Sequence, residues 1–445
     1  MQSLIREAVT FNSTMFSLQQ ALSLRTAEAT RVEPSQLTLL REHLRHAART
    51  PLYKNIFSQI GFSPDNISSI RDLAELPLTN REDIEQGQSM LDPGEGMTYA
   101  DIALTSGTTG EAVIVPYTTR DLNRLAFNET MGFYGAGIRQ GDRVLLAVTL
   151  DRCFIADLAY YSGLVRLGAT AIRSGPGQPA RQWNLIQKLR PKAIVGVPSF
   201  LLRLAVWGNE NGINTRKCGI ESLITIGEPI RSPDYSPTLL GKQLEDAWGA
   251  KIYSSYGATE FETAFCECSA SCGGHVHPEL MIVEIVDDDG KLLPDGQPGE
   301  VIVTPLGVEG FPLVRFRTGD IARLAGTPCQ CGWQTKRLGP IEGRLAQRLK
   351  YKGTTLYPEM IFHALQEYAV QTVYVEVRAA ADLSDELTVV VGSDDQQITK
   401  KIVEDRLQAH LRVRPKVVVK KQAEVLAVMG KDGGRKLKKF FDFRS

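Results

Sequence analysis

Three groups of residues in this chain have types and spacings that could do chemistry. The first is a loop of hydroxyl residues and glycines in "LTSGTTGEAVIVPYT", which runs from Leu104 to Thr118. Glycines let backbone amides turn toward an anion, and hydroxyls add donors to phosphate oxygens. No Gly-Lys-Ser/Thr of a Walker motif ends the loop, and such clusters are also common turns. Its own residues therefore leave phosphate binding and a plain turn open.

Cysteines form the second group. Two of the seven stand alone at Cys153 and Cys218, and the other five gather in the stretches 266–272 and 329–331. In a large cytosolic chain, such clustering favours a bound metal over disulfides. With His275 nearby, the two stretches can close a tetrahedral Cys₃His zinc site, although their spacing is not that of paired CxxC motifs.

The third group consists of carboxylates that follow strand-like runs. Gly227 and Glu228 in "TIGEPI" come after an apolar strand, where α/β proteins place nucleotide-binding loops. Glu260 ends "YGATE", and Asp320 lies in "RFRTGDIARL". By residue type alone, Glu260 would be interpreted as a surface charge, and Asp320 could be an ordinary turn residue.

The elements that must position these groups indicate an α/β protein. With 445 residues we expect at least two domains, since single cores rarely grow beyond roughly 250 to 300 residues. The first hundred residues favour helices, as in "PSQLTLLREHLRHAART" and "PLYKNIFSQIGF". From Gly141 the strand-like runs "RVLLAV", "AIVGV" and "LITIG" alternate with helical stretches such as "ARQWNLIQKLR", which predicts parallel strands with crossover helices.

Two further parts follow. The stretch "LMIVEIVDDDGKLLPDGQPGEVIVTPL" predicts two strands of a hairpin or small β-subdomain. Near Arg344 begins a compact α/β module of about 100 residues. Its helices are expected at "PEMIFHALQEY" and "ITKKIVEDRLQAHL", and its strands at "VYVEV", "LTVVV" and "KVVVK". We expect an N-terminal domain over 1–343 and a C-terminal domain over 344–445.

Composition excludes some functions. Hydrophobic residues make up 43%, charged residues 23%, and 51 basic side chains balance 51 acidic ones, which leaves no sign of a nucleic-acid or membrane surface. The stretch "MQSLIREAVTFNSTMF" lacks the apolar core of a signal peptide, and no segment approaches the ~20 apolar residues of a membrane helix. We expect a cytoplasmic protein without nucleic-acid or membrane partners.

Four segments occur in the order known from the adenylate-forming superfamily of acyl-CoA ligases and adenylation domains, which the chain resembles. They are "TSGTTG" for phosphate binding, "YGATE", "RFRTGDIARL" for ribose binding, and the hinge-like "GRLAQRLKYKG". Within that superfamily the chain resembles the phenylacetate-CoA ligase branch, which includes aryl-acid ligases. The segments "GVPSFL", "GGHVHPEL", "GVEGFPLVRFRTGD" and "CQCG" carry that likeness. The resemblance implies layered α/β sheets with a β-subdomain, followed by a small mobile α/β domain.

The resemblance implies a two-step reaction. ATP activates a carboxylate as an acyl adenylate with release of pyrophosphate, and the acyl group then passes to a thiol. Tyr256 would stack on adenine, Thr259 would donate to the α-phosphate, and Glu260 would hold Mg²⁺. The residues expected to bind ATP or AMP are Thr105, Ser106, Gly107, Thr108, Thr109, Gly110, Gly227, Glu228, Tyr256, Gly257, Asp320 and Arg344. The loop Thr105–Gly110 would be a mobile lid over the β- and γ-phosphates.

The C-terminal "GGRKLKKFFDFRS" resembles the superfamily's last motif, which implies that Lys436 contacts the reacting carboxylate and phosphate. Arg435 stands where the family usually has Gly, and Ala346 replaces the usual hinge Asp, so the pivot stays open. We still expect the small domain to rotate between half-reactions. The neighbouring candidates for the catalytic role are Lys431, Lys438 and Lys439.

Some members of the branch carry zinc at matching positions, which implies a structural zinc that staples a β-subdomain at about 265–335. The expected ligands are Cys268, His275, Cys329 and Cys331, with Cys272 or Cys266 as substitutes. Three interpretations of His277 stay open: it binds the metal, it hydrogen-bonds to a metal ligand, or it is an ordinary strand residue. The remaining histidines are expected as surface or packing residues on helices: His43, His46, His363 and His410.

The expected substrate is a small aromatic carboxylic acid, and the expected acceptor is coenzyme A. Residues compatible with a flat ring near the expected pocket are Tyr134, Phe133, Phe261 and Phe265, any of which could be core instead. Alternatively, the acid is loaded onto a carrier protein's phosphopantetheine thiol. A non-catalytic nucleotide-binding scaffold is less favoured. Members of the branch are often homodimers, which the sequence does not test.

Overall fold

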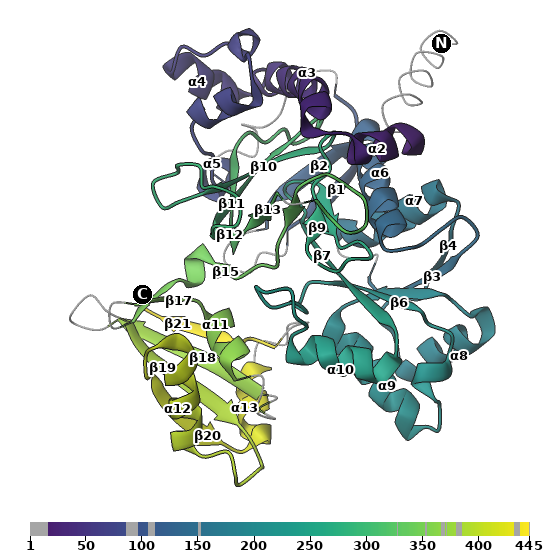
Figure 1. Ribbon diagram of the computed structural model, residues 1–445, viewed down its shortest axis with the longest axis vertical. Coiled ribbons are helices and arrows are strands. Elements are labelled where there is room, and N and C mark those ends of the chain that lie inside the picture. The colour runs from purple at the N-terminus through teal and green to yellow at the C-terminus, as the bar shows by residue number, and fades with distance from the viewer. Residues whose placement is uncertain are drawn as a thin grey trace. The chain divides into compact units, whose positions relative to one another are not determined.

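The computed structural model describes residues 17–85, 97–105, 112–149, 153–326, 328–351, 354–365, 370, 372–379, 385–430 and 437–444. The fold is the expected mixture of helices and sheets (Figure 1). The chain divides into two compact units. The first holds Met1–Arg231, Leu240–Thr318 and Arg323–Pro340, and the second holds Ser232–Leu239, Gly319–Ala322 and Ile341–Ser445.

The first unit begins with helices, as the sequence predicts. They are α2 (Leu18–Thr26), α3 (Ala29–Ala47), α4 (Pro51–Gln59) and α5 (Arg81–Glu85), with 3₁₀ turns η1 (Pro64–Asn66) and η2 (Ile70–Glu75). Pro51 occupies the start of α4, where its missing N–H costs nothing, and the Thr50 hydroxyl accepts from the Tyr53 amide. Proline usually occupies the first turn of a helix, but Pro34 lies inside α3, which begins five residues earlier at Ala29. No described helix is long and apolar enough to cross a membrane.

A six-stranded sheet forms the centre of the first unit, in the order β4-β3-β5-β6-β7-β8. Its strands are β3 (Arg143–Leu146), β4 (Thr170–Arg173), β5 (Ala193–Gly196), β6 (Ser222–Ile226), β7 (Lys251–Ala258) and β8 (Thr263–Cys266). Strands β3 to β7 pair in parallel and β8 is antiparallel to β7. The predicted alternation of parallel strands and helices is confirmed.

Helices cover both faces of this sheet (Figure 1). On one side lie α6 (Thr119–Gly135) and α7 (Ile155–Leu167), and on the other α8 (Pro179–Leu189), α9 (Pro198–Glu210) and α10 (Leu239–Trp248). Side chains alternate along each strand, so Leu146 packs toward α6 and α7 while Leu145 packs toward α8 to α10. On the second face, Trp183 and Trp248 stack with ring centroids 5.4 Å apart.

Smaller sheets complete the first unit. A hairpin pairs β1 (Tyr99–Leu104) with β2 (Ile114–Thr118). Strands β10 (Met281–Val286) and β11 (Gly299–Pro305) pair antiparallel as the predicted hairpin, next to β12 (Phe316–Ala322). A three-stranded sheet contains β9 (Gly274–His275), β13 (Leu324–Ala325) and β14 (Arg337–Leu338).

The second unit contains the end of β12 paired with β15 (Gly343–Arg344), the turn η5 (Leu345–Gln347), and a separate α/β core. A hairpin joins β16 (Leu349–Tyr351) to β17 (Thr354–Leu356), and a four-stranded sheet has the order β20-β19-β18-β21. Its strands are β18 (Thr372–Ala379), β19 (Asp385–Gly392), β20 (Lys416–Lys420) and β21 (Phe440–Phe443). The helices are α11 (Pro358–Ala364), α12 (Lys400–Leu411) and α13 (Gln422–Met429). The predicted strands and helices are present, whereas α13 and β21 were not anticipated.

Candidate functional site

Several predicted site residues lie at the carboxyl end of β7, where ligands bind in open parallel sheets. Tyr256 is half-buried on β7, and its ring stacks on Phe265 of β8 with centroids 6.2 Å apart and planes 14° apart. Gly257 faces Ala264 across the β7–β8 pair. A Cβ at Gly257 would lie 2.8 Å from the Thr263 carbonyl oxygen, so only glycine fits this close approach of two backbones.

Gly257→Ala is expected to lower kcat/KM for ATP-dependent pyrophosphate release about tenfold, because the two strands must part and shift the turn that follows. Gly177→Ala is the matched control, since its new Cβ would meet nothing nearer than the Gln182 side-chain nitrogen at 3.7 Å. Equal activity of both variants would show that the close pairing does not position the turn.

Thr259 and Glu260 lie in the turn between β7 and β8. The Tyr117 hydroxyl on β2 donates to the Thr259 carbonyl at 3.2 Å, which fixes the turn against the β1–β2 hairpin. An Arg81 nitrogen lies 3.7 Å from a Glu260 carboxylate oxygen. The Glu260 carboxylate therefore already faces a cation, and a bound magnesium ion would compete with Arg81 for it.

The two ends of the predicted phosphate loop, at Thr105 and Val113, lie between β1 and β2. The Thr105 amide donates to the Val113 carbonyl at 3.0 Å, and the Val113 amide donates to the Thr105 hydroxyl at 3.0 Å. The Leu104 amide donates to the carbonyl of Cys153, which follows the carboxyl end of β3. Hydrogen bonds thus hold the two ends of the loop together, near the carboxyl edge of the six-stranded sheet. The residues Ser106, Gly107, Thr108, Thr109 and Gly110 lie outside the described part of the chain.

Gly227 and Glu228 follow β6 at the same edge. Gly227 has a φ of 77°, a left-handed conformation that glycine adopts without strain. The Glu228 carboxylate accepts from the Ser199 amide at 2.8 Å and from its hydroxyl at 2.9 Å. Glu228 therefore caps the first turn of α9, a structural role that the sequence did not indicate.

The predicted ribose-binding residues belong to the second unit. Asp320 and Arg344 lie opposite each other where β12 pairs with β15. The Arg344 Nε is 3.1 Å from a carboxylate oxygen of Asp320, and the Arg344 side chain is largely exposed. The two residues thus form one charged pair.

Lys436, together with Lys431 and Arg435, lies outside the described residues. The Lys438 amide donates to the Met429 carbonyl at 2.9 Å, so the described segment 437–444 begins beside the end of α13. The Lys438 ammonium lies over the Phe441 ring at 5.2 Å from its centroid, and Lys439 over Phe362 at 5.7 Å.

The structure brings together the four predicted zinc ligands. The ligand atoms of Cys268, His275, Cys329 and Cys331 all lie within 4.8 Å of one another. Cys268 Sγ is 3.5 Å from Cys329 Sγ, and Cys331 Sγ is 3.4 Å from His275 Nε2. Neighbouring ligands of a tetrahedral zinc lie roughly 3.4 to 3.8 Å apart, so the residues fit this metal.

Polar groups around the cluster support the same fit. The amides of Ala270 and Trp333 each lie 3.4 Å from a cysteine sulfur, on Cys268 and Cys331 respectively. His275 Nδ1 is 2.9 Å from the Thr335 hydroxyl, which leaves Nε2 toward the sulfurs. Burial lowers the pKa of His275 to about 4, and a neutral imidazole is the form that binds metals. Sequence reasoning missed Thr335, since a lone threonine four residues after Cys331 carries no recognisable signal.

The alternative ligands lie in other environments. The Cys272 sulfur accepts from an Arg337 nitrogen at 2.6 Å and is 3.9 Å from Cys329 Sγ, so it borders the group of four from outside. Cys266 is packed in the core between the central sheet, α6 and α7. His277 Nδ1 is 2.5 Å from an Arg25 nitrogen, so His277 is a buried partner of helix α2.

Among the other histidines, His43 is a packing residue. It is buried on α3, and its Nε2 lies 2.8 Å from the Leu313 carbonyl oxygen. His46 Nε2 lies 2.8 Å from the Glu309 carbonyl oxygen. Phe133, Phe261 and Phe265 are almost completely buried in the core. Tyr134 is half-buried beneath the Arg139 guanidinium.

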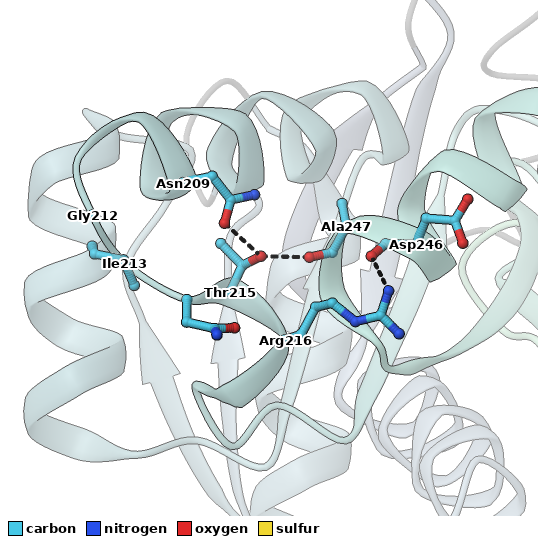
Figure 2. A pocket seen from close by; sticks show the side chains of 8 residues that line it. Asn209, Gly212, Ile213, Thr215, Arg216, Asp246 and Ala247 are labelled. Carbon is cyan, nitrogen blue, oxygen red and sulfur yellow. Dashed lines mark hydrogen bonds between the residues drawn. The ribbon is translucent and has the colours of Figure 1, made fainter.

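A shallow pocket of about 380 Å³ lies elsewhere, between the end of α9 and the end of α10 (Figure 2). The Thr215 hydroxyl donates to the Ala247 carbonyl at 2.5 Å, and Arg216 donates to the Asp246 carbonyl at 3.0 Å. These residues precede β6 and β7, so the pocket is at the amino edge of the sheet. Ligands of such sheets bind at the opposite, carboxyl edge, so this pocket is not the expected ligand site. Its side chains connect the end of α9 to the end of α10.

Residues 59–308 match the family model of AMP-binding enzymes, which is more than half of the chain. The chain is 30% identical to the phenylacetate-coenzyme A ligase of Pseudomonas putida over 87% of this chain and 91% of that protein. It is 27% identical to the Escherichia coli K12 enzyme of the same name over 91% and 92%. A crystal structure of 2-hydroxyisobutyryl-CoA ligase in the postadenylation state is similar in fold, with a TM-score of 0.81 at 22% identity over 95% of this chain and 91% of that one.

The chain therefore belongs to the family of AMP-binding enzymes, which confirms the resemblance seen in the sequence. It is an AMP-forming acid–thiol ligase that uses ATP to make an acyl adenylate.

Proposed function

We propose that this ligase activates a small aromatic acid and transfers it to coenzyme A. The relatives' names support the acid and the acceptor, since they act on phenylacetate and coenzyme A. The observation that carries the proposal is the arrangement at the carboxyl edge of the central sheet. There the turn with Thr259 and Glu260 is hydrogen-bonded to the hairpin that holds the phosphate loop.

In the first half-reaction, a carboxylate oxygen of the acid attacks the α-phosphorus, and pyrophosphate leaves. Thr259 donates a hydrogen bond to the α-phosphate, whose charge increases in the transition state. The amides and hydroxyls of Thr105–Gly110 hold the β- and γ-phosphates. Tyr256 stacks on the adenine, and Phe265, which packs against the Tyr256 ring, holds that ring in place.

Asp320 and Arg344 bind the ribose in this proposal. A carboxylate accepts from both ribose hydroxyls, and the contact with Arg344 orients it. Lys436 neutralises charge as carboxylate and α-phosphate approach. The two described alternatives, Lys438 and Lys439, lie over aromatic rings, which supports assigning the role to Lys436. The domain of residues 344–445 moves between the half-reactions, as lids and domains do in many enzymes.

In the second half-reaction, a thiolate attacks the acyl carbon, and AMP leaves with the oxygen that bridged carbon and phosphorus. Coenzyme A is the acceptor that the relatives support. Glu260 would hold a magnesium ion beside the phosphates, and that ion would supply positive charge to the phosphate oxygens.

Cys268, His275, Cys329 and Cys331 would hold zinc as a structural ion. Four protein ligands would leave no open position for a reacting water, so the metal would hold loops together and take no part in the chemistry. Trp333 and His275 pack edge to face with centroids 4.9 Å apart, which links the metal site to the core beneath α2.

The proposal is tested by offering the purified protein ATP, magnesium and a panel of small aromatic and aliphatic acids, with coenzyme A or a holo carrier protein as acceptor. We expect pyrophosphate release with aromatic acids and a thioester with coenzyme A. A thioester on the carrier protein alone would favour the alternative acceptor. Pyrophosphate release with aliphatic acids only would contradict the substrate class.

A further inference from the structure

A stripe of buried polar side chains runs along α6. Asp121, Arg124 and Asn128 are almost completely buried, and their spacing of three and four residues places them on one face of the helix. Buried polar groups cost free energy unless they are hydrogen-bonded, so the stripe indicates groups that this helix must hold. Asp121 closes the capping box at the start of α6, which leaves the partners of Arg124 and Asn128 to be explained.

Those partners lie on β8, the edge strand of the central sheet, and on the turn before it. The Asn128 amide nitrogen donates to the Ala264 carbonyl at 3.0 Å, and the Asn128 side-chain oxygen accepts from the Ala264 amide at 2.9 Å. Asn128 thus takes the place of a neighbouring strand along the free edge of β8. One helical turn earlier, an Arg124 nitrogen donates to the Glu262 carbonyl at 2.7 Å.

The Arg124 guanidinium holds several segments at once. It also donates to the Thr263 hydroxyl at 3.1 Å, to the Leu280 carbonyl at 2.5 Å and to the Leu306 carbonyl at 2.8 Å. The Arg124 side chain has no exposed surface. Because a planar guanidinium points its donors in fixed directions, the Glu262 carbonyl is positioned relative to the segments before β10 and after β11.

The backbone of Glu262 is strained. Its φ is 50°, a left-handed conformation that costs free energy for residues other than glycine and persists where the surrounding structure imposes it. The hydrogen bond from Arg124 to the Glu262 carbonyl is a contact of this kind. Burial raises the pKa of the Glu262 carboxyl, and the Arg124 charge opposes this shift, so the two side chains also attract each other.

The turn that Glu262 ends carries two residues of the proposed reaction centre. At its start, the Tyr117 hydroxyl donates to the Thr259 carbonyl, and at its end Arg124 holds the Glu262 carbonyl. A change of φ at Glu262 would redirect the chain within a few residues of Thr259 and Glu260. An error of about 1 Å in the placement of a reacting group can lower a rate roughly 100-fold.

We propose that Arg124 is a positioning residue for adenylation, which holds Glu262 in its left-handed conformation and thereby keeps Thr259 and Glu260 in place. Arg124 acts through the turn and contacts neither ATP nor the acid. The inference rests on the proposed function, because it takes Thr259 as the donor to the α-phosphate.

A double-mutant cycle tests this role, because glycine adopts the left-handed conformation without strain. Arg124→Lys keeps the charge, but a single ammonium cannot span all the acceptors that the guanidinium reaches. We expect this change to lower kcat for pyrophosphate release about 10- to 100-fold and to leave KM for ATP nearly unchanged, since the positioning acts in the transition state. In a Glu262→Gly background, the same change should lower kcat by less than about threefold.

Two matched backgrounds separate conformation from charge and from general stability. Glu262→Gln removes the carboxylate and retains the strained backbone, so Arg124→Lys should have its full effect there. Arg190→Gly relieves a similar conformation, with a φ of 46°, at the exposed end of α8, and should not rescue Arg124→Lys. Arg203→Lys, at an exposed position on α9, should match the wild type.

The outcomes separate the inference from the proposed function. An unchanged kcat in Arg124→Lys, or an equal loss in the wild-type and Glu262→Gly backgrounds, would overturn the positioning role. Equal rescue by Glu262→Gln would assign the effect to charge and overturn the conformational role. Should Arg124→Lys not fold, Arg124→Gln takes its place in the cycle. A normal kcat in a folded Thr259→Ala protein would instead overturn the role of Thr259 in the proposed function.

Discussion

Asp320→Ala is expected to lower kcat/KM for ATP by about 100- to 1,000-fold. The carboxylate would accept two hydrogen bonds from the ribose, each contributing about 1.5 to 2 kcal/mol because the acceptor is charged, and 1.4 kcal/mol corresponds to a factor of ten. Its partner Arg344, 3.1 Å away, would also lose its orienting contact. The measurement is pyrophosphate release as a function of ATP concentration at saturating acid.

A matched control separates this effect from damage to the fold. Glu386→Gln removes an exposed carboxylate from β19 in the same unit and should retain full activity. Arg344→Ala should have a smaller effect than Asp320→Ala, since the carboxylate remains. An unchanged dependence on ATP in a folded Asp320→Ala protein would remove Asp320 from the nucleotide site.

The second large effect concerns the metal. Cys329→Ala is expected to reduce bound zinc from about one ion per chain to almost none, because it removes one of the four ligands, whose sulfur lies 3.5 Å from the Cys268 sulfur. Structural zinc contributes folding free energy directly, so we expect a loss of at least about 3 kcal/mol and, for a chain of this length, a Tm lower by roughly 3 °C or more. Elemental analysis and thermal unfolding measure the two effects.

Two cysteine variants make this test specific. Cys218→Ser changes a half-buried cysteine outside the cluster and should alter neither zinc content nor Tm by much. Cys272→Ser should keep its zinc, because the Cys272 sulfur is engaged by Arg337 and lies outside the group of four. Loss of zinc in Cys272→Ser with retention in Cys329→Ala would reverse the ligand assignment.

Local sequence patterns were sufficient to predict much of the fold. The central strands, the β10–β11 hairpin and the strands β18 to β20 all follow from runs of apolar residues and turn signals. The four metal ligands were also found, since cysteines and histidines in two short stretches have few structural explanations. Strand β21 is not predicted, because "FFDFR" resembles part of a functional motif. Its pairing with β18 also depends on residues about 65 positions away in the sequence.

Long-range polar contacts could not be predicted. Arg25 forms an ion pair with Glu279 at 2.6 Å across more than half of the chain, and nothing in α2 indicates such a partner. Arg124 donates to the carbonyls of Leu306, Glu262 and Leu280, which joins α6 to three loops.

The central claim is that an acyl adenylate forms from the acid and ATP, and oxygen-18 tests it most directly. The protein is incubated with an aromatic acid labelled in both carboxylate oxygens, ATP, magnesium and coenzyme A, and the nucleotide product is analysed by mass spectrometry. We predict AMP that carries a single labelled oxygen, in amounts equal to the acyl-CoA and pyrophosphate formed. Unlabelled AMP, or labelled phosphate with ADP as the product, would contradict the account.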